Sequence, residues 1–284
     1  MASTRRSRIF ITAGFLLVVG VVFLRFGLPG VLHAAGLHPE YERGDFALDG
    51  RRILLVATNH DVLGEGGDPT GVAISEVTEP YYDFLDAGIQ VDLASPRGGV
   101  IPVDPQTLFW VMSTPSVDRY REDPALQAKL ENSIPIAEVD ASDYDAIFLA
   151  GGWGAAYDLG YSEELGEKIT EANANGAVIG GVCHGPLGLL QAKAPDGSPL
   201  VAGRRMTAVT DKQVQELGID VTPQHPEREL RAAGAVFESD TAFRDVFATH
   251  VVVDKNLVTG QNQNSGGAAA QSVMELLSQD QTGS

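Results

Sequence analysis

From Arg51 onward, short runs of consecutive apolar residues alternate with longer amphipathic stretches. Such runs are typical of strands buried on both faces of a parallel sheet, and the stretches between them have the spacing of helices with one apolar face. We expect strands at residues 53–58, 89–94, 146–150, 177–182, 250–253 and 257–259, and helices at residues 72–87, 162–175, 211–217, 228–233 and 265–277. This order predicts an α/β fold in which helices flank a doubly wound, mostly parallel sheet.

The chain has one cysteine, Cys183, at the point where the expected strand at residues 177–182 turns abruptly into a helix. Such a turn lifts a nucleophile out of the chain, and the neighbouring Gly181 and Gly185 relieve crowding around it. The backbone N–H groups that open the helix favour a thiolate over a thiol. The alternative is a structural cysteine, because free cysteines are among the most buried residues. We interpret Cys183 as a candidate nucleophile.

In doubly wound sheets, ligands bind beyond the carboxyl ends of the strands. Cys183 and Gly152 stand at two such ends, and His60 and Asp61 follow the first strand. One pocket could collect these residues, with His60 and Asp61 in its lining. No metal site is predicted, because the six histidines are scattered without the spacing of metal ligands.

The formal net charge of the chain is −18 at pH 7. Nucleic acid is therefore not an expected partner, since phosphate binding needs clustered Lys and Arg. The single cysteine cannot form an internal disulfide, so stability must come from packing of the hydrophobic residues, which make up 44% of the chain.

The amino terminus differs from the rest of the chain. Basic residues in the tail at residues 1–8 precede an apolar stretch at residues 9–32. This stretch predicts either a transmembrane helix or a cleaved signal peptide, which would yield a secreted protein. For a single-pass membrane anchor, the basic residues place the tail in the cytoplasm and the domain on the extracytoplasmic side. Residues 33–50 are expected to form a linker, residues 51–279 the catalytic domain, and residues 280–284 a second tail.

Several separate motifs occur here in the order in which they stand in the ThiJ/PfpI superfamily, and the chain resembles most its glyoxalase III and heat-shock chaperone branch. The similarity runs from about Arg51 to Leu277 and is specific because the motifs occur together. They are Thr70-Gly71-Val72 through Glu76 to Pro80-Tyr81-Tyr82, Ala94-Ser95-Pro96-Arg97-Gly98-Gly99, Asp123-Pro124, Glu138-Val139-Asp140, Asp143-Tyr144-Asp145, Gly151-Gly152, Val182-Cys183-His184-Gly185-Pro186 and Val258-Thr259-Gly260-Gln261-Asn262.

The resemblance implies a flavodoxin-like fold of the class I glutamine amidotransferase kind. It also implies a glutathione-independent glyoxalase, a lyase of the D-lactate dehydratase type, that needs no cofactor and acts on small carbonyl compounds. Methylglyoxal would give D-lactate. Cys183 would attack the aldehyde to form a hemithioacetal, and Glu76, which matches the family's glutamate, would move a proton between the two carbons. Relatives commonly dimerise, so a homodimer is expected here too.

The resemblance also assigns roles around the nucleophile. The backbone N–H groups of Gly152 and His184 are expected to stabilise an oxyanion. The His184 side chain would pair with the cysteine, but the acidic third member of a triad is out of register here, and Asp211 and Glu216 are the candidates for it. Trp153 replaces a histidine common in relatives, and it is expected to line the pocket without transferring protons.

Two other kinds of function remain open at this point. The same turn and oxyanion donors can support acyl transfer, so a cysteine peptidase or amidase is one alternative. A holding chaperone or a redox sensor that uses Cys183 is the other. A complete Cys-His-acid triad would favour the peptidase.

Overall fold

The computed structural model describes residues 18–219 and 221–282, and its centre is a seven-stranded sheet with the order β3-β2-β1-β4-β5-β9-β8. Neighbouring strands are parallel except for β8 and β9, which are antiparallel. The strands of this sheet are β1 (Arg52–Val56), β2 (Gln90–Ser95), β3 (Ile134–Pro135), β4 (Ala146–Leu149), β5 (Val178–Val182), β8 (Val251–Asp254) and β9 (Leu257–Gly260). A separate parallel pair consists of β6 (Arg205–Met206) and β7 (Val236–Phe237).

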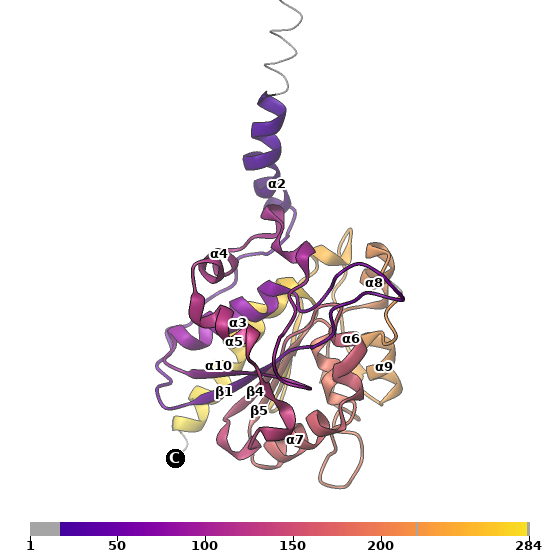
Figure 1. The fold of residues 1–284 in the computed structure, drawn as a ribbon. Helices are drawn as coiled ribbons and strands as arrows, with labels where there is room; N and C mark the ends of the chain where they lie inside the picture. Colours follow the sequence, from indigo (N-terminus) through magenta and orange to yellow (C-terminus); the bar gives the residue numbers. More distant parts are fainter. Residues whose placement is uncertain (1–17, 220, 283–284) are drawn as a thin grey trace, which may run out of the picture.

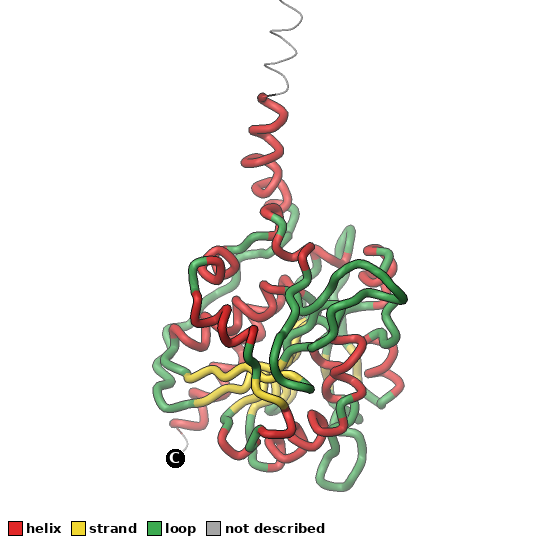
Figure 2. Tube along the Cα trace, in the orientation of Figure 1, coloured by secondary structure: helices red, strands yellow, loops and turns green. Residues whose placement is uncertain are grey.

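Helices cover both faces of the sheet (Figures 1 and 2). Alternate residues of β1 show the division, because Ile53 and Leu55 join one buried apolar cluster while Leu54 and Val56 join the other. The first cluster is covered by α3 (Ile74–Asp86), α4 (Pro115–Arg121), α5 (Pro124–Glu131) and α10 (Gly266–Thr282), and the second by α6 (Ala155–Asp158), α7 (Glu163–Ala174) and α9 (Pro226–Ala232). The helix α8 (Asp211–Leu217) lies near the carboxyl ends of the strands.

The α/β architecture and the parallel sheet are as the sequence predicts. The elements α4 and α5 were not expected, although both carry an N-cap followed by proline. The side chain of Thr114 accepts a hydrogen bond from the N–H of Val117, and that of Asp123 accepts from Ala125. This combination is a helix-start signal, and it identifies both helices in a region without strong apolar periodicity.

The predicted transmembrane helix is wrong. Within residues 18–219 and 221–282, no helix is both long and apolar enough to cross a membrane. From residue 18 the chain is helical, but a π-helical turn, η1 (Phe23–Gly27), separates the first turn from α2 (Leu28–Ala34). This finding contradicts the spanning helix at residues 9–32, the membrane as a partner and the single-pass localisation. Residues 1–17, which include the predicted cytoplasmic tail, lie outside the described residues, as do residues 283 and 284.

The segment that was expected to be a linker packs against the domain. Leu37 and Leu48 are buried. The N–H of His38 donates to Asn264 Oδ1 at 2.8 Å, and the hydroxyl of Tyr41 donates to Asp83 Oδ2 at 3.0 Å. The N–H of Gly44 donates to the side chain of Gln271 in α10. These contacts fix the segment along α3 and α10, and they bring its first residues to the carboxyl end of the sheet.

Candidate active site

The strand β5 ends at Val182, and Cys183 follows it in a left-handed backbone conformation with a φ of 60°. Residues other than glycine seldom adopt positive φ, and such conformations concentrate at functional sites. The next element is η7 (Gly185–Leu189), a short 3₁₀-helix rather than the α-helix that the sequence suggested. The sharp turn expected at Cys183 is therefore present, but the helix after it is only five residues long.

Gly185 permits this turn because a side chain has no room there. A Cβ at Gly185 would lie 2.1 Å from the carbonyl oxygen of Leu149, a backbone atom of β4. We expect Gly185→Ala to lower the free energy of unfolding by ~1–3 kcal/mol through overpacking. Gly181→Ala is the matched control, because the nearest atom to its Cβ lies at 3.3 Å. Urea unfolding compares the two, and equal stability would contradict this account of the turn.

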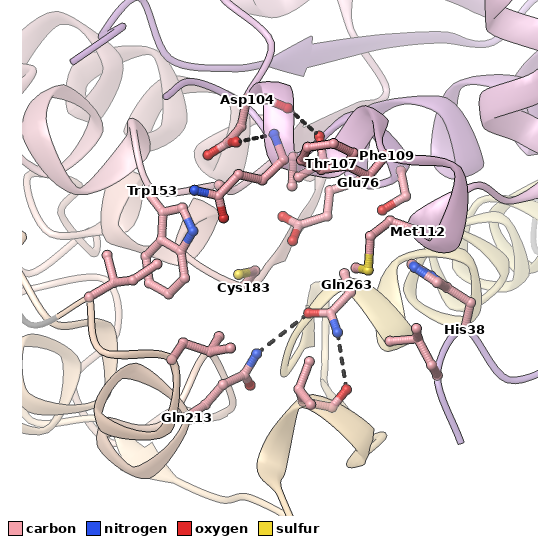
Figure 3. Close-up of a pocket in the computed structure, with 18 of the residues that line it drawn as sticks. His38, Glu76, Asp104, Thr107, Phe109, Met112, Trp153, Cys183, Gln213 and Gln263 are labelled. Atoms are coloured by element: carbon pink, nitrogen blue, oxygen red, sulfur yellow. Dashed lines mark hydrogen bonds between the residues drawn. The ribbon is translucent and has the colours of Figure 1, made fainter. Parts of the chain in front are cut away.

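Glu76 in the first turn of α3 is the side chain that meets Cys183. It is only 1% exposed. Its Oε2 accepts a hydrogen bond from the N–H of Gly151 at 2.9 Å, and its carboxyl also hydrogen-bonds the thiol of Cys183. Figure 3 shows the carboxyl of Glu76 and the sulfur of Cys183 together at the centre of the pocket. The structure thus brings together two residues that are far apart in the chain.

Two backbone donors also point at the sulfur. The N–H groups of Gly152 and His184 donate hydrogen bonds to Cys183, and they are the same two groups that the sequence analysis assigned to an oxyanion hole. Gly152 has a φ of 98°, and a Cβ there would lie 2.4 Å from the backbone nitrogen of Ala73. Only glycine allows the turn after β4 to come this close to the start of α3.

Burial decides the protonation of the Glu76–Cys183 pair. Burial raises the pKa of Glu76 to about 8, against the smaller lowering by the Cys183 and Gly151 hydrogen bonds. Burial and the adjacent Glu76 also raise the pKa of the Cys183 thiol well above its usual value, although the N–H groups of Gly152 and His184 act in the opposite direction. Both shifts favour the protonated forms of the two groups, which is opposite to the thiolate preference expected from the sequence.

His184 lies beside the nucleophile as a neutral imidazole. Its Nδ1 is 3.4 Å from Cys183 Sγ. Burial, with a contribution from His225, lowers the pKa of His184 to about 3. The Nε2 atom is buried and finds no hydrogen-bond partner among the residues that the structure describes. His184 therefore contacts the sulfur, but no carboxylate within the described chain orients its ring.

The two candidates for a third acid lie elsewhere. Asp211 is 3.8 Å from Nδ1 of His225 and 3.4 Å from the guanidinium of Arg228. Glu216 accepts a hydrogen bond from the N–H of Asp245 at 2.8 Å. The structure brings neither carboxylate to His184, so no Cys-His-acid triad is assembled by these residues.

This placement gives a prediction for both acids. Asp211→Asn and Glu216→Gln are each expected to retain catalytic activity within ~3-fold of the wild type, because loss of an acid or base in the reacting site costs ~10²–10⁴-fold and neither residue contacts it. Steady-state rates of product formation measure this. A loss of ~10²-fold or more in either variant would show that a triad forms during turnover.

Of the other residues expected in the pocket, Trp153 lines the cavity, whereas His60 and Asp61 do not. The indole of Trp153 lines the cavity and packs edge-to-face on the His184 ring, with ring centroids 4.9 Å apart. His60 instead stacks on Tyr157, with ring centroids 3.9 Å apart, and Asp61 is exposed. Neither His60 nor Asp61 lines the cavity at Cys183. Among the described residues, no group of three or more His, Cys, Asp or Glu is placed to hold a metal ion.

The cavity itself has a volume of about 480 Å³. Figure 3 shows Trp153 on one side of Cys183 and Met112 with His38 on the other, while Gln213 and Gln263 lie opposite Glu76. The amides of Gln213 and Gln263 hydrogen-bond each other at 3.4 Å. Sequence reasoning missed the lining residues His38, Thr107, Phe109, Met112, Gln213 and Gln263. No spacing signal marks them, because they come from separate loops and helices.

The chain is similar in sequence to two proteins that are named glyoxalases. The chain is 29% identical over 238 residues to the glutathione-independent glyoxalase HSP31 of Saccharomyces cerevisiae, covering 80% of this chain and 98% of that protein. It is 26% identical over 230 residues to glyoxalase 3 of Candida albicans, covering 78% of this chain and 97% of that one.

Solved structures agree with the fold. The Rapid Encystment Protein 24 KDa of Francisella tularensis aligns with a TM-score of 0.74 and 31% identity, covering 80% of this chain and 99% of that chain. Glyoxalase III of Candida albicans aligns with a TM-score of 0.72 and 24% identity, covering 80% and 97%. The model of the DJ-1/PfpI family matches residues 69–276, which is most of the chain and includes both Glu76 and Cys183. This chain therefore belongs to the DJ-1/PfpI family.

Proposed function

We propose that this protein is a glutathione-independent glyoxalase that converts 2-oxoaldehydes such as methylglyoxal to 2-hydroxy acids, with D-lactate as the product from methylglyoxal. The observation that carries the proposal is the contact between the carboxyl of Glu76 and the thiol of Cys183 at a cavity. A carboxyl with a pKa of about 8 can both give and take a proton near neutral pH. The activity named for the yeast relatives supports the same assignment.

The first step forms a carbon–sulfur bond. The reactive form of the Glu76–Cys183 pair has first lost one of its two protons to solvent. The sulfur of Cys183 then adds to the aldehyde carbon, the C=O double bond becomes a single bond, and the aldehyde oxygen takes the one proton that the pair retains. The product is a hemithioacetal, and Glu76 is left as a carboxylate. The N–H groups of Gly152 and His184, which now donate to the sulfur, are placed to stabilise negative charge on the neighbouring oxygen.

The second step moves a proton between two carbons. The Glu76 carboxylate removes the proton from the carbon bound to sulfur, and the electron pair of this C–H bond forms a carbon–carbon double bond as the ketone oxygen becomes an enediolate. Glu76 then delivers the proton to the adjacent carbon, while the hydroxyl proton of the hemithioacetal passes to the oxygen on that carbon. The result is a thioester of the 2-hydroxy acid. Water hydrolyses this thioester, the acid leaves, and the Cys183 thiol is restored. The overall change adds one water to the 2-oxoaldehyde and needs no external oxidant or reductant.

The structure does not favour the peptidase alternative. His184 would have to act as a general base toward the thiol, yet its pKa is lowered to about 3 and its Nε2 has no partner within the described chain. A redox sensor needs an accessible thiol of low pKa. Cys183 is only 7% exposed and its pKa is raised.

The proposal predicts how the rate depends on pH. The reactive pair must have lost one of its two protons, and the pKa of Glu76 near 8 sets where this occurs. We expect kcat/KM for methylglyoxal to rise by ~10-fold per pH unit below about pH 8 and to level off above it. Initial rates between about pH 6 and pH 9.5 provide the test. A profile that is flat from about pH 6 to 8 would contradict the proposed role of the pair.

A further inference from the structure

The cavity is large for a three-carbon substrate. Its volume of about 480 Å³ falls within the range of ~300–1,000 Å³ that is typical of pockets enclosing drug-sized ligands. Cys183 and Glu76 occupy one region of it, between Trp153 and Met112 (Figure 3). A molecule of methylglyoxal bonded to the sulfur would leave most of the space to water. The remaining space must therefore accept whatever the substrate carries beyond its two carbonyl groups.

The wall around this space is apolar. The apolar residues of this wall come from four parts of the chain that are remote in sequence. These are the amino-terminal segment (residues 32–38), the turn around η3 (Trp110–Met112), the end of α8 and the turn η8 (Asp245–Phe247). These apolar residues are Leu32, Leu37, Phe109, Val111, Met112, Leu217, Ile219, Val246 and Phe247. Several are partly exposed, with Phe109 at 60% and Leu217 at 38%. Contact with an apolar ligand would remove this surface from water.

The lining offers no positive charge to an anionic substituent. None of the described residues that line the cavity is Lys or Arg. Burial lowers the pKa of His38 to about 4, so its imidazole is neutral at physiological pH. The carboxyl of Asp104 is already engaged by the hydroxyl of Thr70 and the N–H of Gln106. A phosphate or carboxylate on the substrate would find no cationic side chain among these lining residues to offset the loss of its hydration, which is costly.

The amino-terminal segment completes this wall. Leu32, Leu37 and His38 line the cavity, although they precede residues 69–276, which match the family. Leu37 is buried, and the N–H of His38 is held by Asn264 at 2.8 Å. The segment therefore has a fixed position at the pocket and forms part of its wall.

We infer that the preferred substrates are 2-oxoaldehydes with an uncharged, apolar substituent of about six or more carbons, which lies against the wall formed by Phe109, Leu217 and the amino-terminal segment. This inference rests on the proposed glyoxalase function, and it names the substrate class of the same site. The wall raises kcat/KM by holding the substituent, and the chemistry at Cys183 is the same for short and long substrates.

Hexylglyoxal and methylglyoxal test this directly, because both are alkyl ketoaldehydes and differ only in chain length. For the full chain, kcat/KM for hexylglyoxal is expected to exceed that for methylglyoxal by at least ~10-fold, since each buried methylene strengthens binding by roughly threefold to fourfold. The double variant Phe109→Ser/Leu217→Ser should lower this ratio by ~10-fold, mainly through KM for hexylglyoxal. Phe243→Ser is the matched control, because Phe243 is 92% exposed and does not line the cavity.

Each outcome decides the inference. Equal kcat/KM values for the two aldehydes in the wild type, or a ratio that is the same in the double variant and in Phe243→Ser, would overturn the substrate class while leaving the glyoxalase function in place. Turnover of a phosphorylated 2-oxoaldehyde as efficient as that of hexylglyoxal would also overturn it. If the wild type converts neither alkyl aldehyde, the proposed function fails, and this inference fails with it.

Discussion

Replacing Cys183 with alanine is expected to lower kcat/KM for methylglyoxal by at least ~10²-fold, because the substitution removes the atom that bonds to the aldehyde carbon. The chain contains no second cysteine that could take over this role. His184 cannot replace it either, since burial lowers the pKa of its imidazole to about 3 and so weakens it as a nucleophile. Any residual turnover would come from binding, from the backbone donors and from Glu76.

Loss of activity in Cys183→Ala must be separated from loss of structure. Cys183 has a φ of 60°, and alanine in this conformation carries the same backbone strain as cysteine. The backbone of the turn should therefore persist in the variant. Thermal unfolding of wild type and variant checks this, and we expect similar transition temperatures. A folded variant that keeps more than about a tenth of the wild-type kcat/KM would be incompatible with nucleophilic catalysis by this residue.

Glu76→Gln is expected to lower kcat by ~10²–10⁴-fold, the range for removing a general acid or base. The amide has nearly the shape of the carboxyl, and its oxygen can still accept the hydrogen bond that Gly151 donates to Glu76. It cannot carry the proton between the two carbons. The variant should therefore still form the hemithioacetal but fail to isomerise it, and kcat should fall while binding of the aldehyde is retained.

Glu79→Gln is the matched control for this change. Glu79 is one turn further along α3, is buried, and has a pKa raised to about 8, chiefly by burial and then by Asp83. It does not line the cavity. We expect kcat in this variant to remain within ~3-fold of the wild type, because Glu79 does not touch the reacting atoms. If both glutamine variants lost activity to the same extent, the role of Glu76 would be structural.

The sequence predicts the sheet well, because the strands are continuous apolar runs and their ends are set by glycine and polar residues. The turn at Cys183 is equally visible, since glycines surround a single cysteine at a strand end. The short β3 strand could not be found, as two residues carry no periodicity. The prediction for residues 9–32 was wrong because apolar composition does not by itself fix the length of a helix: no helix of the described residues is both long and apolar enough to cross a membrane, and a π-helical turn at Phe23–Gly27 interrupts the α-helical hydrogen bonding.

The site is predictable only in part. In the sequence, Glu76 looks like any glutamate in a helix, and only the family motif identifies it as a candidate catalytic residue. Its burial and its contact with Cys183 depend on how α3 packs, which the sequence does not show. The position of Asp211 and Glu216 relative to the family motif could not decide whether either acid reaches His184, because the loop after β6 determines which residues they contact. The apolar wall is assembled from four remote segments, and no local pattern in any of them indicates a shared cavity.

The most direct measurement is the amount of lactate formed per methylglyoxal consumed by the full chain in the absence of glutathione. Disappearance of methylglyoxal alone is insufficient, because it also modifies arginine and lysine side chains. The account predicts one D-lactate per methylglyoxal over many turnovers by the wild type, and a loss of lactate formation of at least ~10²-fold in Cys183→Ala and in Glu76→Gln. Consumption without lactate, or lactate formation that survives both substitutions, would contradict it.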